Sequence, residues 1–165
     1  MTQETNLTIE LLRRAMGIEQ EGRNFYLKAA QTTQDKKGQE IFKTLANDEG
    51  NHYNLLKSQH DTLREKGNWV VSPEVKKVSV DLGKPIFPRG IEALKKKVTE
   101  KSDDRDALLF GMDIEIRSYD LYRQANVTHA SGKLMFAYLT EQEMGHFNLL
   151  MERFEAQFGP VSWWD

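Results

Sequence analysis

Hydrophobic residues recur every three or four positions in four long segments of this chain, which is the spacing of one face of an α-helix. The predicted helices cover residues 7–32, 36–66, 103–127 and 131–158. Only a few residues separate the first helix from the second and the third from the fourth, so each pair is predicted to form an antiparallel hairpin. The pattern therefore predicts an all-α fold, an antiparallel four-helix bundle made of two helix hairpins.

A long connection separates the two hairpins. It contains three of the four prolines and is expected to be mainly extended, with a short strand at its valines and a brief helix at "IEALKKKV". In a four-helix bundle such a crossover carries the chain from the end of one hairpin to the start of the next. We expect a single domain, residues 1–165, consisting of a hairpin at 7–66, a crossover at 67–102, a hairpin at 103–158 and an aromatic tail at 159–165.

Composition limits the chemistry that this domain can perform. The chain has 165 residues, of which 39% are hydrophobic and 29% charged, and its net charge of −2 comes from interspersed acids and bases. This balance gives no reason to expect a nucleic acid or a membrane as partner, and the N-terminus lacks the apolar core of a signal peptide, so a cytoplasmic location is expected. Cysteine is absent, which excludes disulfides, thiol catalysis and cysteine-ligated metals.

The apolar stripe of the second helix is interrupted by two polar residues. In "LANDEGNHYNLL", residues 45–56, Glu49 and His52 lie on the same helical face as Leu45 and Leu56. Burying such groups unpaired costs on the order of several kcal/mol. The interruption therefore needs a compensating partner.

The same interruption recurs in the second half of the chain. At an offset of 94 residues, Phe42, Leu45, Glu49, His52 and Leu56 match Phe136, Leu139, Glu143, His146 and Leu150. At an offset of 96 residues, the first-helix stripe Leu12, Ala15, Glu19, Gly22, Tyr26 and Ala29 matches the third-helix stripe Leu108, Gly111, Glu115, Ser118, Tyr122 and Ala125. The chain is thus two similar hairpins in sequence.

Packing these hairpins into a bundle brings four carboxylates and two imidazoles together. They are Glu19, Glu49, His52, Glu115, Glu143 and His146. One Glu from each of two helices and a Glu-x-x-His pair from each of the other two is the ligand arrangement of ferritin-like di-iron and di-manganese proteins. Four carboxylates also balance the charge of two divalent ions. We expect two metal ions, iron in the first place, with manganese or zinc as alternatives.

Two other interpretations of the cluster are disfavoured. A metal-free bundle with a polar hydrogen-bond network is difficult to build, because four carboxylates cannot satisfy one another without donors or cations. A zinc protease would need the motif His-Glu-x-x-His, and Asp48 stands where the first histidine would be.

Several residues near the stripe receive separate predictions. Tyr26 and Tyr122 are either hydrogen-bond donors to a ligating carboxylate or core aromatics with a satisfied hydroxyl, and both interpretations stay open. The small residues Gly22, Gly111 and Ser118 are expected to leave room for access to the metals. Acids off the stripe are expected to be solvated, and histidines without a Glu three residues before them are expected at the surface; these residues are Glu21, Asp113, Glu141, His60 and His129.

The segments "GIEQEGRNFY", "EGNHYNLL", "DIEIRSYDLY" and "EMGHFNLL" resemble the rubrerythrin branch of the ferritin-like superfamily, over all four predicted helices. The resemblance implies a ferritin-like bundle and a di-iron site in which Glu49 and Glu143 bridge the metals. Glu19 with His52 would then complete one iron, and Glu115 with His146 would complete the other. It also implies a homodimer or higher homo-oligomer that reduces hydrogen peroxide or dioxygen.

Two features depart from the usual rubrerythrin pattern. The chain has no cysteine-rich rubredoxin domain, so electrons are expected from a separate donor protein such as a rubredoxin. Rubrerythrins also tend to carry a second Glu three residues after the third-helix ligand, an acid linked to peroxidase-type metal movement, where this chain has Ser118. The resulting set of four Glu and two His is closer to the symmetric ferritin or bacterioferritin pattern.

Three functions follow from these observations. The first is a non-haem di-iron oxidoreductase that consumes peroxide or dioxygen. The second is a ferroxidase coupled to iron storage, which the proline-rich crossover and the lack of a short fifth helix argue against. The third is a metal-dependent sensor or interaction module, for which the tail residues Trp163 and Trp164 could dock on another subunit or pack over their own bundle.

Overall fold

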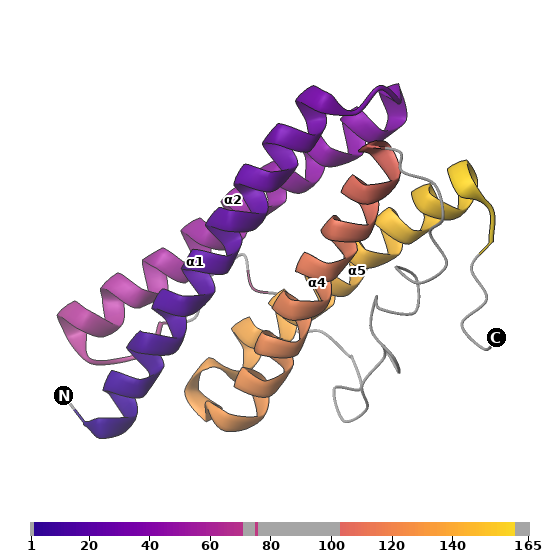
Figure 1. The fold of residues 1–165 in the computed structure, drawn as a ribbon. Helices are drawn as coiled ribbons and strands as arrows, with labels where there is room; N and C mark the ends of the chain where they lie inside the picture. Colours follow the sequence, from indigo (N-terminus) through magenta and orange to yellow (C-terminus); the bar gives the residue numbers. More distant parts are fainter. Residues whose placement is uncertain (1, 71–74, 76–102, 161–165) are drawn as a thin grey trace.

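In the described part of the computed structural model, four long helices are arranged as two hairpins (Figure 1). The structure describes residues 2–70, 75 and 103–160. The helices are α1 (Gln3–Thr32), α2 (Lys36–Lys66), α4 (Asp103–Thr128) and α5 (Lys133–Phe158), with a short 3₁₀ turn, η1 (Ala130–Gly132), before α5. The predicted all-α, ferritin-like four-helix bundle is confirmed. Most of the predicted crossover, with its short strand and brief helix, and the tail residues Trp163 and Trp164 lie outside the described residues.

Local capping sets the helix ends. Helix α1 begins four residues earlier than the hydrophobic pattern predicts, because the hydroxyl of Thr2 accepts the backbone N–H of Thr5 at 3.1 Å. Helix α2 ends at Gly67, whose φ of 70° is the left-handed conformation that favours glycine. Helix α5 ends before Gly159, which is followed by Pro160, a pair of residues that disfavours continuation of a helix.

Polar contacts at one end of the bundle fix the direction of the second hairpin. The carboxylate of Asp104, at the start of α4, accepts the backbone N–H groups of Gln34 and Asp35 at 3.1 and 3.3 Å. Arg153, near the end of α5, pairs with the carboxylate of Asp35 at 2.8 Å. The start of α4 and the end of α5 therefore lie beside the α1–α2 turn. Helix α4 runs antiparallel to α1, and α5 runs antiparallel to α2 (Figure 1).

Among the described residues, the apolar core forms two clusters. The turn-side cluster, nearer the α1–α2 turn, contains Tyr26, Ala29, Ala30, Phe42, Leu45, Ala46, Leu108, Leu109, Met112, Phe147, Leu150 and Phe154. The far-side cluster contains Ile9, Leu12, Ala15, Leu56, Leu63, Tyr122, Ala125, Met135, Phe136 and Leu139. Between them, along the same stripes, lie the predicted ligands, which we call the polar layer. None of the described helices is long and apolar enough to cross a membrane.

Candidate metal centre

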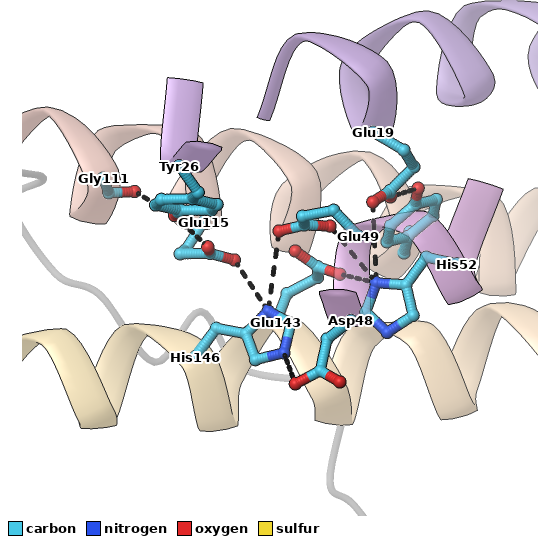
Figure 2. A network of polar contacts seen from close by, with 10 residues as sticks. Glu19, Tyr26, Asp48, Glu49, His52, Gly111, Glu115, Glu143 and His146 are labelled. Carbon is cyan, nitrogen blue, oxygen red and sulfur yellow. Dashed lines mark hydrogen bonds and ion pairs between the residues drawn. The ribbon is translucent and has the colours of Figure 1, made fainter. Parts of the chain in front are cut away.

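All six predicted ligands are buried in the polar layer, and each of the four helices contributes to it. Glu115 and Glu143 are 0% exposed, and the most exposed member, His146, is only 7% exposed. Glu19 comes from α1, Glu115 from α4, and the two Glu-x-x-His pairs come from α2 and α5. Figure 2 shows the carboxylates and imidazoles converging from these helices.

The ligand atoms form two overlapping groups. One group consists of Glu19, Glu49, His52 and Glu143, and the other consists of Glu49, Glu115, Glu143 and His146. Within each group the potential ligand atoms lie within 4.8 Å of one another. The two groups share Glu49 and Glu143. This arrangement suits two ions bridged by two carboxylates.

Both histidines turn the same ring nitrogen toward the carboxylates. Nδ1 of His52 lies 2.9 Å from Glu143 Oε1 and 3.5 Å from Glu19 Oε2. Nδ1 of His146 lies 3.3 Å from Glu115 Oε2. The two rings stack with centroids 5.4 Å apart. Nδ1 is therefore the nitrogen available to a metal in both groups.

Two tyrosines donate hydrogen bonds into the layer from opposite hairpins. The hydroxyl of Tyr26 on α1 donates to a carboxylate oxygen of Glu115 on α4, and its oxygen also lies 3.3 Å from the carbonyl of Gly111. The hydroxyl of Tyr122 on α4 donates to Glu19 on α1. Of the two interpretations left open by the sequence, the structure favours hydrogen bonding to a candidate ligand. Each of these hydrogen bonds joins the two hairpins. The sequence alone does not indicate which carboxylate each tyrosine contacts.

Asp48 also contacts the site, although the hydrophobic pattern does not predict it. Its half-buried carboxylate oxygen Oδ2 lies 3.6 Å from Nε2 of His146, on the side of the ring away from the other carboxylates (Figure 2). Asp48 lies beside the stripe rather than on it, and its partner is on another helix. The signal available in the sequence was an acid directly before Glu49, where the repeated segment has Gln142.

The layer has few internal hydrogen-bond partners for its ligand atoms. Among the described residues, the buried side-chain atoms without a hydrogen bond of normal geometry include Glu19 Oε2, both carboxylate oxygens of Glu49 and Glu143, Glu115 Oε2, and Nδ1 of His52 and His146. These are the atoms that face one another in the two groups. Carboxylate and imidazole ligands in this ratio suit iron and manganese, and the residues present therefore fit two such ions.

Protons compensate part of the carboxylate charge when no cation is bound. Burial, followed by the charge of Glu49, raises the pKa of Glu19 from 4.5 to about 8. Burial and the neighbouring carboxylates raise the pKa of Glu143 well above its usual range. Burial also raises the pKa of Glu49, but its contacts with Glu19 and the two imidazoles lower that pKa below its ordinary value. Glu49 is thus a carboxylate acceptor among protonated neighbours.

The histidines and tyrosines carry the protons that face these carboxylates. Burial lowers the pKa of His52, but the carboxylates around Nδ1 raise it well above its ordinary value. The pKa of His146 is raised in the same way, with Asp48 making the largest favourable contribution. Burial, followed by the charge of a carboxylate on the opposite hairpin, raises the pKa values of Tyr26 and Tyr122, so both hydroxyls stay protonated donors.

Residues predicted to lie off the site do so, with one correction. Glu21 is exposed, and Asp113 and Glu141 are half-buried outside both ligand groups. His129 is half-buried, but the prediction of a surface position for His60 is wrong, because this side chain is 7% exposed. His60 lies four residues after Leu56 on the face of α2 that is buried, and helical phase therefore decides its position, whether or not a Glu precedes it.

The prediction that small residues open a route to the metals is wrong at Gly111. A Cβ atom there would lie 3.1 Å from a Leu150 methyl and 3.2 Å from the Tyr26 ring, so side chains already fill this space. At Gly22 a Cβ would make ordinary contacts at 3.5 to 3.7 Å with Ile114 and Glu49. Glycine at position 111 thus lets the side chains of Leu150 and Tyr26 pack closely against α4.

Comparisons with known proteins agree with this architecture. The family profile described as Rubrerythrin matches residues 10–153, which include all six candidate ligands. A solved structure of a hypothetical protein from Pyrococcus furiosus is similar with a TM-score of 0.64 and 22% sequence identity, over 90% of this chain and 88% of that chain. At this identity the likeness concerns the fold alone. No curated protein gave a significant sequence match.

Proposed function

The chain belongs to the rubrerythrin family, and from this premise we propose that it is a non-haem di-iron oxidoreductase that reduces hydrogen peroxide or dioxygen. The observation that carries the proposal is the pair of overlapping ligand groups sharing Glu49 and Glu143. A buried layer that holds two metal ions side by side suits a two-electron reaction, because each ion can supply one electron at the same place.

The proposed roles follow from the position of each side chain. Glu49 and Glu143 would bridge two ions, with one position completed by Glu19 and His52 and the other completed by Glu115 and His146. Two ferrous ions held there would supply two electrons, enough to reduce hydrogen peroxide to water or dioxygen to hydrogen peroxide.

The protein's own contribution is to orient the ligands and to place protons. The hydroxyls of Tyr26 and Tyr122 fix the orientation of Glu115 and Glu19 through hydrogen bonds. Their raised pKa values keep these protons on the tyrosine oxygens at neutral pH. The two apolar clusters on either side exclude bulk water, which strengthens the electrostatic contacts inside the layer.

Electrons are proposed to come from a separate donor protein such as a rubredoxin, since this chain has no cysteine to ligate an iron centre of that type. We further propose a cytoplasmic location and assembly as a homodimer or higher homo-oligomer, as the family resemblance implies.

Ferroxidase activity coupled to iron storage is the second candidate. It is favoured by one observation: Ser118, 2% exposed, occupies the place where rubrerythrins tend to carry an additional Glu. The remaining set of four Glu and two His is the symmetric one that storage proteins use.

Anaerobic loading with ferrous iron separates the two candidates. Peroxide and dioxygen are then added separately, and the absorption of ferric iron is followed. Rapid oxidation by peroxide, saturating at two irons per chain, supports the oxidoreductase. Oxidation by dioxygen alone, with continued uptake beyond two irons per chain, would support storage and overturn the first proposal. Failure to bind any iron would overturn both.

A further inference from the structure

We propose that the two ion positions are unequal, and that Asp48 is the positioning residue that makes the His146 position bind a divalent ion more tightly than the His52 position. The inference rests on the proposed function, because it takes the polar layer to be a two-ion site. It implies that two ions enter in a fixed order, the first beside Glu115 and His146.

Asp48 acts on His146 from the side of the ring opposite the ion. Nδ1 of His146 faces Glu115 and Glu49 at 3.3 and 3.6 Å, while Nε2 faces Asp48 Oδ2 at 3.6 Å. An imidazole that binds a cation through Nδ1 must keep its remaining proton on Nε2. A carboxylate beside Nε2 favours that tautomer, holds the ring orientation and makes Nδ1 a more basic ligand.

His52 has no such partner within the described part of the chain. Its three carboxylate contacts, with Glu19, Glu49 and Glu143, all involve Nδ1. No described carboxylate lies within ion-pair range of its Nε2. The position equivalent to Asp48 in the second hairpin, 94 residues later, is Gln142, whose amide carries no charge.

Other features of the two positions are closely matched. Each has one terminal Glu, one histidine and one tyrosine hydroxyl donating from the opposite hairpin. The histidines are similarly buried, at 3% and 7% exposure. Asp48 places a carboxylate beside Nε2 of His146, and Gln142 offers no charge at the equivalent position of the other hairpin. Removing the outer partner of a ligating histidine typically costs roughly 10- to 100-fold in metal affinity.

The test is a titration of the metal-free chain with cobalt(II). Binding is monitored by calorimetry and by the visible absorption of bound cobalt. We expect two binding steps whose dissociation constants differ by roughly 10- to 100-fold. Asp48→Asn should weaken the tighter step by that factor, so that the steps merge. Asp113→Asn, which removes an acid outside both ligand groups, is the matched control and should leave both steps unchanged.

Two further sets of variants assign the steps and guard against a merely structural effect. His146→Gln should remove the tighter step with its cobalt spectrum, and His52→Gln should remove the weaker one. The mirror change Gln142→Asp should strengthen the weaker step, a gain that damage to the fold cannot produce.

Three outcomes would overturn the inference. They are two equal steps in the unaltered chain, an Asp48→Asn titration that matches the Asp113→Asn control, or a Gln142→Asp variant without any gain. In each of these cases two ions still bind, so the proposed two-ion site survives. A chain that binds no cobalt, no ferrous iron and no manganese would instead overturn the proposed function.

Discussion

The polar layer and the two apolar clusters beside it are built on the same helical stripes, yet burial has opposite consequences in them. In the clusters, residues such as Leu12 and Leu108 are stabilised simply by leaving water. In the layer, the same loss of water raises the pKa values of Glu19 and Glu143 and leaves ligand atoms without partners. The stability of the clusters is thus intrinsic to the chain, whereas that of the layer depends on cations or protons.

The sharpest way to separate the two regions is to remove a shared carboxylate. Glu143→Ala should abolish binding of both ions, because Glu143 belongs to both ligand groups. The free energy of unfolding of the metal-free protein should not fall, because the change removes a buried carboxyl group whose pKa is raised. Metal content per chain and urea unfolding of the metal-free form measure the two effects.

The controls for this change are Glu21→Ala and Glu141→Ala, which remove acids outside both ligand groups. Neither should alter metal content, and stability should change by about 0.5 kcal/mol or less. Glu49→Ala should likewise abolish binding of both ions, because Glu49 also belongs to both ligand groups. A loss of metal in the controls as large as in these variants would mean that the assigned helical face is wrong.

Truncation in the apolar clusters should give the reverse result. Leu12→Ala and Leu108→Ala occupy matching positions in the two hairpins, one in each cluster, and both side chains are almost fully buried. Each change should lower the free energy of unfolding by about 2–5 kcal/mol, in the metal-free and in the loaded protein. Metal content should stay at its original value. Loss of metal without loss of stability would show that the apolar clusters contribute to metal binding and not to the free energy of unfolding.

Raising the pH should weaken the metal-free layer. The folded protein holds the proton of Glu19 with a pKa of about 8, against 4.5 as the ordinary value, so this contribution to stability is present at low pH and is lost as the pH rises through 8. The raised pKa values of His52 and His146 act in the same direction. Between pH 6 and pH 9 we expect the metal-free Tm to fall by roughly 5 °C.

Loaded protein should show the opposite trend over the same pH range, because metal binding displaces these protons and strengthens as they leave. Differential scanning calorimetry of both forms measures the gap between their Tm values, which should widen with pH. Glu19→Gln should flatten the metal-free curve. A gap that narrows toward pH 9 would contradict the assignment of protons in the layer.

The smallest expected effect concerns the tyrosine hydroxyls. Tyr26→Phe and Tyr122→Phe each remove one donor to a candidate ligand and keep the ring that packs in the core. Each should weaken metal binding by about tenfold. Each should also lower the free energy of unfolding of the metal-free protein by about 1–3 kcal/mol, because a buried carboxylate oxygen loses its donor. Tyr138→Phe, on a half-buried tyrosine outside the ligand groups, is the control for calorimetric titrations. Equal affinities in all three variants would assign Tyr26 and Tyr122 to packing alone.

The polar layer was predictable from sequence because its members break an apolar period twice in the same phase. Glu49, His52 and their repeats stand where leucines would be expected, and helical geometry then places them together. The four helices followed from the same period, with an error of four residues at the start of α1, where capping by Thr2 overrides the apolar pattern.

Residues that act across helices were harder to predict. Asp48 lies off the stripe, and nothing local links it to His146, which is 98 residues away in the chain. The pairing of Tyr26 with Glu115 depends likewise on which helices are neighbours. His60 is buried because its helical phase matches that of Leu56, although no Glu stands three residues before it. Sequence period thus predicts which face is buried, whereas tertiary packing decides which polar groups meet there.

The two tyrosine–carboxylate hydrogen bonds that join the hairpins give the molecule a built-in optical reporter. Each donor and its carboxylate acceptor lie on different hairpins, so the two bonds last only while the hairpins stay together. Both tyrosines resist ionisation in the closed bundle and would lose that resistance on separation. The ultraviolet signal of tyrosinate in alkaline solution should therefore record the opening of the bundle without any attached label.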